Sequence, residues 1–261
     1  MVKLIATDMD GTLLNSDKKL PEGFEGVYEQ LNKQGIKFVV ASGRQFYTLE
    51  EEFAHFNHEM SFIAENGGFI KMGEDVHLLK PMKTANVEKL IKYIRSIEGA
   101  EIVLCGKEGA YVESDDEKFL REARLYYHRC KRVDDLLNVE DDILKLAVND
   151  FINLESTTLE AVQCFADEFH ISTSSSIWLD IMPKGVNKGE AIKFLQNRLN
   201  ISESETMVFG DYLNDYEMIE AAGYSYAMGN AHDKIKKIAK YETATNDENG
   251  VLIVLEDLLN K

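Results

Sequence analysis

The chain has 261 residues, 44% of them hydrophobic and 29% charged, so it can form one large domain or two with a sizeable buried core. Its 46 acidic and 29 basic residues give a formal net charge of −17, which disfavours proteins that bind nucleic acid or anionic membranes. Three cysteines without C-x-x-C spacing, Cys105, Cys130 and Cys164, indicate neither a disulfide framework nor a zinc site.

No apolar run in the sequence approaches the length of a membrane-spanning helix. Asp8 also follows the N-terminus too closely to leave room for the apolar region of a signal peptide. We therefore expect a cytoplasmic protein that has neither a nucleic acid nor a membrane as its partner.

The first part of the chain alternates between short apolar strands and helices. Strands are predicted at residues 3–7, 36–41 and 61–64, and helices at 21–34 and from residue 42 to about 56. Gly35 is expected to end the first helix. This alternation with short links is typical of a parallel, doubly wound sheet. Residues 69–72 and 76–79 follow as a predicted hairpin.

The pattern changes between residues 82 and 183. Strands are predicted near 101–105, 110–113, 143–149, 170–173 and 177–182, and helices at 84–97, 116–127 and 155–168. Paired strands with helices between them indicate an α+β sheet covered on one face. Residues 80–83 (KPMK) and 182–185 (MPKG) are predicted linkers, so residues 82–183 are expected to be an inserted second domain.

The end of the chain returns to the first pattern. Helices are predicted at 188–199, 214–222, 232–239 and 249–259, and strands at 206–209 and 224–227. The predicted fold class is α/β, with a Rossmann-like doubly wound parallel sheet in a discontinuous core of residues 1–81 and 184–261. The α+β domain of residues 82–183 is inserted into that core.

Two carboxylates, Asp8 and Asp10, follow the first predicted strand at a spacing of two. Residues two apart in an extended backbone point to the same side, and open α/β sheets bind ligands beyond the carboxyl ends of their strands. Two acids alone could simply belong to a surface turn that has no function. Three further segments argue against that, namely residues 41–44 (ASGR), 187–189 (NKG) and 210–215 (GDYLND).

Together with residues 8–12 (DMDGT), these segments resemble, in order, the four motifs of the haloacid dehalogenase superfamily over nearly the whole chain. The insert is similar to the type IIB cap of the Cof-type hydrolases. Residues 38–42 (FVVAS) and 226–230 (YAMGN) look most like bacterial sugar-phosphate phosphatases. The resemblance implies a Mg²⁺-dependent phosphatase for small phosphorylated sugars that works through an aspartyl phosphate.

The resemblance also implies a role for each acid. Asp8 is the implied nucleophile, and Asp10 is the implied acid that protonates the leaving oxygen and then the base that activates water. The implied Mg²⁺ ligands are Asp8, Asp211 and the backbone carbonyl of Asp10, and Asp215 is implied to hold the metal directly or through water. Carboxylate and carbonyl oxygens are the ligands that Mg²⁺ prefers.

The implied phosphate- and substrate-binding residues are Ser42, Gly43, Arg44, Asn66, Lys188 and Asn214. Ser42 and Gly43 offer a hydroxyl and backbone N–H groups at a predicted helix start, where phosphate can bind. Lys188 offers a charge to the phosphate and to Asp8. Arg44 could face the phosphate, the substrate or the cap.

Asp180 and Trp178 share one face of a predicted strand. Asp180 could accept hydrogen bonds from sugar hydroxyls while Trp178 packs on the ring; alternatively, Trp178 fills the cap core and Asp180 lies at a solvated edge. Residues 126–128 (YYH) are expected to lie in the core or on the surface of the cap. His55 and His58 are expected to be solvated.

Two other functions stay open. A phosphomutase of the same superfamily would use the same residues, and product analysis would separate it from a phosphatase. A non-catalytic phosphosugar-binding protein could lose Asp8 or Asp10 freely, so the presence of both acids argues against it.

Overall fold

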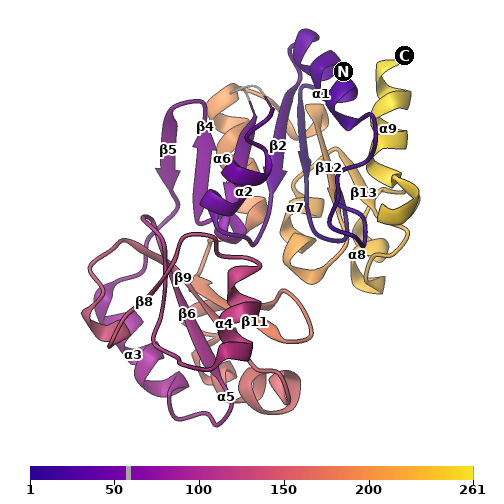
Figure 1. Cartoon of the computed structure of the whole chain (residues 1–261). Helices are drawn as coiled ribbons and strands as arrows, with labels where there is room; N and C mark the ends of the chain where they lie inside the picture. Colours follow the sequence, from indigo (N-terminus) through magenta and orange to yellow (C-terminus); the bar gives the residue numbers. More distant parts are fainter. Residues whose placement is uncertain (57–59, 261) are drawn as a thin grey trace.

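The structure is a computed structural model that describes residues 1–56 and 60–260. Within these residues, eight strands form one sheet and six strands form a second (Figure 1). We call residues 82–183, which contain the second sheet, the cap, and the remaining residues the core. His58 lies outside the described residues.

The core sheet has the strand order β14-β13-β12-β1-β2-β3-β4-β5. Its strands are β1 Leu4–Thr7, β2 Lys37–Ala41, β3 Ser61–Ala64, β4 Phe69–Met72, β5 Asp75–Leu78, β12 Thr206–Gly210, β13 Tyr224–Ala227 and β14 Tyr241–Glu242. From β14 to β3 neighbouring strands run parallel, whereas β4 and β5 are antiparallel additions at one edge. The carboxyl ends of β1, β2, β3 and β12 therefore meet at one edge of the sheet.

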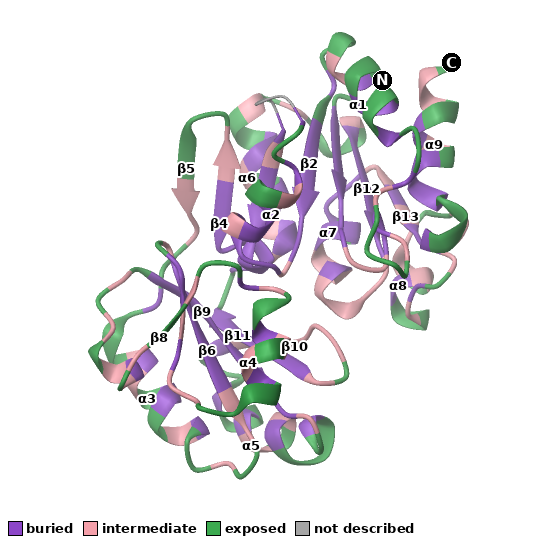
Figure 2. Ribbon diagram, in the orientation of Figure 1, coloured by how far each residue is buried: buried purple, intermediate pink, exposed green. Residues whose placement is uncertain are grey.

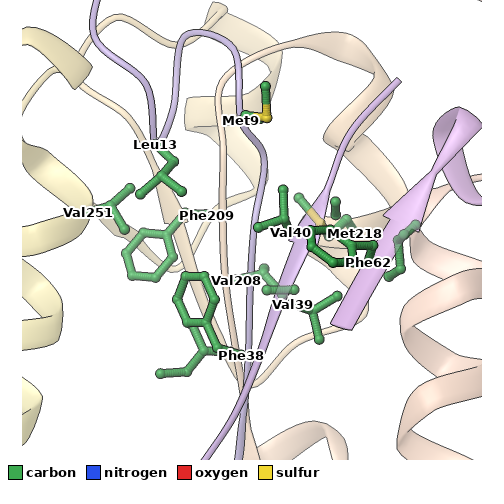
Figure 3. Packing of buried hydrophobic residues seen from close by; sticks show 14 of the residues in the cluster. Met9, Leu13, Phe38, Val39, Val40, Phe62, Val208, Phe209, Met218 and Val251 are labelled. Carbon is green, nitrogen blue, oxygen red and sulfur yellow. The ribbon is translucent and has the colours of Figure 1, made fainter. Parts of the chain in front are cut away.

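Helices cover the core sheet and bury its central strands. They are α1 Phe24–Lys33, α2 Phe46–Glu52, α6 Lys188–Leu199, α7 Tyr216–Glu220, α8 Asp233–Ile238 and α9 Gly250–Leu259. Helix α1 packs on α9, and α6 packs on α7. Phe38 of β2 meets Phe24 and Tyr28 of α1 edge-on, and Figure 3 shows Val251 of α9 beside Phe209 of β12. Every residue of β1 is buried, as a continuous apolar strand in a parallel sheet should be. Every residue of its neighbour β12 is buried as well (Figure 2).

The cap sheet has the strand order β10-β11-β9-β6-β7-β8 and is antiparallel except between β7 and β8. Its strands are β6 Glu101–Gly106, β7 Ala110–Val112, β8 Cys130–Arg132, β9 Ile143–Asn149, β10 Phe169–Thr173 and β11 Trp178–Pro183. Three helices accompany them: α3 Thr84–Ile94, α4 Glu117–Arg124 and α5 Glu160–Val162.

The two faces of the cap sheet differ because residues alternate along each strand. Leu146 and Ile181 belong to the apolar face, which packs with α3. Ala147 and Trp178 belong to the opposite face, where Phe119 of α4 covers part of the sheet. The prediction of a sheet covered on one face is therefore only partly right, because α4 covers part of the second face.

The predicted α/β fold class is confirmed, and several boundaries are wrong. Helix α1 begins at Phe24 rather than Pro21, and α2 begins at Phe46 rather than at residue 42. The predicted helix at 155–168 is divided into π, α and 3-10 turns. Strands β8 and β14 span only three and two residues, too short for a periodic signal. The cap boundaries at residues 82 and 183 stay a prediction.

Among the described residues, no helix is both long enough and apolar enough to cross a membrane.

Candidate active site

A cavity of about 450 Å³ is lined by side chains of both the core and the cap. The predicted site residues that line it are Asp8, Asp10, Ser42, Gly43, Arg44, Asp180, Asp211 and Asn214. The other predicted residues, Asn66, Lys188 and Asp215, are buried and hydrogen-bond to residues of the lining. The structure thus brings all the predicted site residues to one place.

Asp8 lies directly after β1, where its backbone N–H continues the sheet by donating to the carbonyl of Phe209 at 3.0 Å. Lys188, the first residue of α6, is fully buried. Its Nζ donates to Asp8 Oδ1 at 2.5 Å and to Asp215 Oδ1 at 2.7 Å. Burial opposes the charge of this lysine, but Asp215 and Asp8 raise its pKa.

Asp8, Asp211 and Asp215 form a cluster whose carboxylate oxygens lie within 4.8 Å of one another. Burial, followed by the charge of Asp215, raises the pKa of Asp211 to about 7, and burial raises the pKa of Asp8. Like charges gathered in a largely buried site favour a bound cation. The donor set consists of hard oxygens only, so these residues fit Mg²⁺ better than a softer metal.

Two glycines of the motifs are required by close approaches to this cluster. A Cβ on Gly210 would lie 2.7 Å from Cβ of Asp215. Gly11 has φ +80°, and a Cβ there would lie 2.6 Å from Oδ2 of Asp211. Side chains at these positions would displace the carboxylates.

The carboxylate of Asp10 is held by two cations. Arg44 donates to both oxygens of Asp10, at 2.7 and 2.6 Å, and Lys18 donates to Oδ1 at 2.7 Å. Burial opposes ionisation of this carboxyl group, but the hydrogen bonds from Arg44 and then from Lys18 outweigh burial and lower the pKa of Asp10. Arg44 also pairs with Glu52, and its guanidinium lies 5.7 Å from the ring centroid of Tyr126. The structure thus places Arg44 between Asp10 and the cap.

Ser42 and Gly43 lie in a loop rather than at a helix start, which corrects the prediction. Oγ of Ser42 accepts from the backbone N–H of Arg44 at 3.1 Å. The chain stays extended at Gln45, whose side chain accepts from the N–H of Arg129 at 2.9 Å and donates to its carbonyl at 3.1 Å. Contact with the cap therefore accompanies the late start of α2.

Lys145 of β9 is a buried site residue that the sequence analysis missed. Its Nζ donates to the carbonyl of Gly43 at 2.7 Å and pairs with Asp180 at 3.0 Å and Glu65 at 3.1 Å. Asp180 also accepts from Nδ2 of Asn66 at 2.7 Å. A lysine among the apolar residues of ILKLAV was the available signal, because a strand buried on both faces tolerates a lysine only if it is paired.

Trp178 lies in the cap core and also reaches the cavity, so packing on a sugar ring stays a prediction. Its ring packs near Phe119, Tyr126 and Tyr127 in the cap, and it also lines the cavity. Asp180 does not lie at a solvated edge, because it is buried. His128 pairs with Glu51 of the core at 2.6 Å, at the exposed surface.

Comparison with known proteins identifies the family of this chain. The profile of the haloacid dehalogenase-like hydrolase family matches residues 5–255. The chain belongs to this family. As a haloacid dehalogenase-like hydrolase, it is 37% identical to the 5-amino-6-(5-phospho-D-ribitylamino)uracil phosphatase YbjI of Escherichia coli, with 99% of this chain and 96% of that protein covered. It is 28% identical to the HMP-PP phosphatase of Cronobacter sakazakii over 88% of this chain and 85% of that protein.

Solved structures share this fold over nearly the whole chain. SMU.1108c from Streptococcus mutans matches with a TM-score of 0.93 and 30% identity, with both chains fully covered. A haloacid dehalogenase-like hydrolase from B. subtilis matches with a TM-score of 0.88 and 26% identity over 98% of this chain and all of that chain. The implied family is confirmed, and the chain is a phosphatase that hydrolyses phosphoric monoesters.

Proposed function

We propose that this phosphatase hydrolyses small phosphorylated sugars, depends on Mg²⁺ and works through an aspartyl phosphate on Asp8. The observation that carries the proposal is the position of Asp8. It lies at the carboxyl end of β1, lines the cavity and has Lys188 hydrogen-bonded to one carboxylate oxygen. A carboxylate held in this way by an ammonium group is oriented for attack on a phosphorus atom.

In the first step, an oxygen of Asp8 forms a bond to phosphorus as the bond from phosphorus to the sugar oxygen breaks. The departing oxygen takes a proton from Asp10. In the second step, Asp10 takes a proton from a water molecule whose oxygen attacks the same phosphorus, and the carboxylate of Asp8 leaves. Inorganic phosphate and the free sugar are the products.

Arg44 and Lys18 hold Asp10 ionised in the structure, as its lowered pKa indicates. An ionised Asp10 suits the second step, in which it acts as a base. The first step needs a protonated Asp10, so a phosphate that competes for Arg44 and Lys18 would have to loosen their hold on this carboxylate.

Asp8, Asp211 and Asp215 would hold Mg²⁺, and the backbone carbonyl of Asp10 remains a predicted fourth ligand. When bound, Mg²⁺ supplies positive charge that offsets the repulsion between the carboxylates and the incoming phosphate. Thr12 keeps Asp211 in place, since its hydroxyl donates to Oδ1 of Asp211 at 2.7 Å.

A second candidate substrate is a phosphorylated polyol chain that carries a pyrimidine ring. Two observations favour it: the name of the relative that is 37% identical, and the aromatic side chains of Tyr126, Tyr127 and Trp178 in the cavity wall. Aromatic walls stack on planar rings and also pack on sugar rings. Three serines at residues 174–176 line the same cavity and offer hydroxyls to a polyol.

Phosphate release from a panel of substrates tests these proposals. The panel contains hexose phosphates, 5-amino-6-(5-phospho-D-ribitylamino)uracil, a nucleotide, pyridoxal phosphate and p-nitrophenyl phosphate, each with Mg²⁺ and with EDTA. Rapid phosphate release from a phosphorylated sugar or polyol in the presence of Mg²⁺, but not in EDTA, supports the proposal. A phosphorylated isomer of a hexose 1-phosphate with little free phosphate would indicate a mutase, and binding without turnover would indicate a sensor.

A further inference from the structure

A buried cluster of charged and polar side chains joins the cap to the core behind the cavity wall. Lys145 and Asp180 come from cap strands β9 and β11, and both are buried. The partners of Lys145 in the core are the carbonyl of Gly43, at 2.7 Å, and the carboxylate of Glu65, at 3.1 Å. Its partner within the cap is Asp180, at 3.0 Å.

The second oxygen of Asp180 extends the cluster into another motif of the site. It accepts from Nδ2 of Asn66 at 2.7 Å, and Oδ1 of Asn66 accepts from Nδ2 of Asn214 at 3.0 Å. The backbone N–H of Asn66 donates to the carbonyl of Ser42 at 3.0 Å. One carboxylate of the cap is thereby connected to the loops that follow β2, β3 and β12.

The loop that receives these contacts has an unusual backbone. Glu65, Asn66 and Gly67 have successive φ angles of +50°, +51° and +104°. Non-glycine residues rarely adopt this region unless the surroundings hold them there. Two of these residues, Glu65 and Asn66, are the core partners of Lys145 and Asp180. The cap is thus one source of the contacts that keep the loop in this conformation.

The cluster also depends on the cap being closed over the core. Lys145 and Asp180 belong to the cap, whereas Gly43, Glu65 and Asn66 belong to the core. If the cap moved away from the core, the contacts of Lys145 with Gly43 and Glu65 and of Asp180 with Asn66 would all break. Closure takes these charges out of water, so it requires that Lys145 and Asp180 each find their partners in the core and in the cap.

We propose that Lys145 and Asp180 are positioning residues that hold Gly43, Asn66 and, through Asn66, Asn214 in place for the phosphate group when the cap closes. The proposal rests on the proposed function. It assigns Asp180 an effect on every phosphate ester, whatever the leaving group, instead of a contact with sugar hydroxyls. Cap closure and completion of the phosphate site are then one event.

Asp180→Asn is the test variant, because it keeps the shape of the side chain and leaves Lys145 paired with Glu65. Loss of a hydrogen bond to a charged group predicts a roughly tenfold fall in kcat/KM. The fall should be equal for a sugar phosphate and for p-nitrophenyl phosphate, which has no hydroxyls. A fall confined to the sugar phosphate would overturn the proposal and make Asp180 a specificity residue; no fall with either substrate would also overturn it.

A double-mutant cycle tests whether Asp180 acts through Asn66. Asn66→Gly removes the side chain but keeps a residue that accepts a positive φ. In one connected cluster, the double variant should be little worse than the more damaged single variant. Losses in kcat/KM that multiply would show that Asp180 acts by another route, and the proposal would be overturned.

Fluorescence supplies a readout that does not depend on turnover. Trp178 is the sole tryptophan of the chain and lines the cavity, so acrylamide quenching reports access to it. Quenching should increase in Asp180→Asn and in Lys145→Met relative to the wild type, and stay unchanged in the control Lys131→Met, at an exposed lysine of β8. Unchanged quenching in folded Asp180→Asn would contradict the coupling to closure.

Circular dichroism melting establishes that each variant is folded, and Asp180→Asn carries the test if Lys145→Met does not fold. Failure of the proposed function has a different signature, namely a wild-type protein that releases no phosphate from any ester. The quenching comparison would still decide the coupling in that case.

Discussion

Asp211 is a carboxyl group whose proton affinity differs strongly between the folded and unfolded chain. Burial, followed by the charge of Asp215, raises its pKa from 3.8 to about 7. The folded protein therefore binds this proton more tightly than the unfolded chain does. Its contribution to stability is fully present below the unfolded pKa and is lost as the pH rises through the folded pKa.

We therefore predict that the melting temperature of the protein in EDTA falls between pH 5 and pH 8. Mg²⁺ should raise the melting temperature more at pH 8 than at pH 5, because a cation binds the ionised carboxylates. Asp211→Asn should flatten the dependence on pH and weaken the response to Mg²⁺. Equal stabilisation by Mg²⁺ at both pH values would argue against this cluster as the metal site.

A second prediction concerns Asp10, which we propose to protonate the leaving oxygen. Asp10→Asn should reduce hydrolysis of a sugar phosphate more than hydrolysis of p-nitrophenyl phosphate, because a sugar alkoxide needs the proton and p-nitrophenolate hardly does. The measured quantity is kcat/KM for p-nitrophenyl phosphate divided by kcat/KM for the sugar phosphate. This ratio should be higher in the variant than in the wild type. If both substrates lose the same factor, Asp10 does not act mainly as the acid of the first step.

The meeting of Asp8 and Asp211 could be predicted from the sequence, because their motifs adjoin the carboxyl ends of the neighbouring parallel strands β1 and β12. Lys188 could be predicted to join them only from the resemblance of residues 187–189 to a family motif. The partners of Lys145 and Asp180 could not. These residues are 35 positions apart, and Lys145 meets Glu65 and Asp180 meets Asn66 only because the cap lies against the core. No local pattern in the sequence encodes the docking of one sheet on another.

At the scale of elements, the approach of α6 to α7 depends on a glycine. A Cβ on Gly189 would overlap the carbonyl of Glu217 in α7. The preceding residue, Lys188, reaches Asp8 and Asp215 from the first turn of α6. A shift of this helix would therefore move the ammonium group away from the carboxylates.

Gly189→Ala should thus lower the free energy of unfolding by about 1–3 kcal/mol, the usual cost of overpacking. It should also lower kcat, because the position of Lys188 changes. Gly26→Ala is the matched control, since Gly26 lies in α1 and has nothing within 4 Å of an added Cβ. That variant should be neutral or slightly more stable. Equal melting temperatures for the two variants would contradict the packing argument.

Periodicity identified long elements well and their ends less well. The sequence placed α6 and β9 at the observed bounds because both have strong patterns and clear flanking residues. It started α2 four residues early, since Ser42 and Gly43 look like a helix start. The actual start follows Gln45, whose side chain bonds to Arg129 of the cap.

At the scale of the whole molecule, the proposed active site combines parts that the chain separates widely. The core supplies Asp8 and the acidic cluster, and the cap supplies Trp178, Lys145 and Asp180 to the same cavity. The core and the cap lie on opposite sides of that cavity, and Figure 1 shows the cap sheet below the core sheet. A closed cap would keep bulk water away from the nucleophile while the phosphate is transferred.

The central claim is that Asp8 attacks phosphorus, and phosphate release by Asp8→Asn tests it most directly. A neutral amide cannot form the acyl phosphate, so turnover should fall at least ~10³-fold. The melting temperature should be retained, because the change removes one charge from a repulsive cluster and Lys188 keeps Asp215 as a partner. Exposed Asp17→Asn serves as the control with full activity. Phosphate release by folded Asp8→Asn at a rate near that of the wild type would contradict the covalent mechanism.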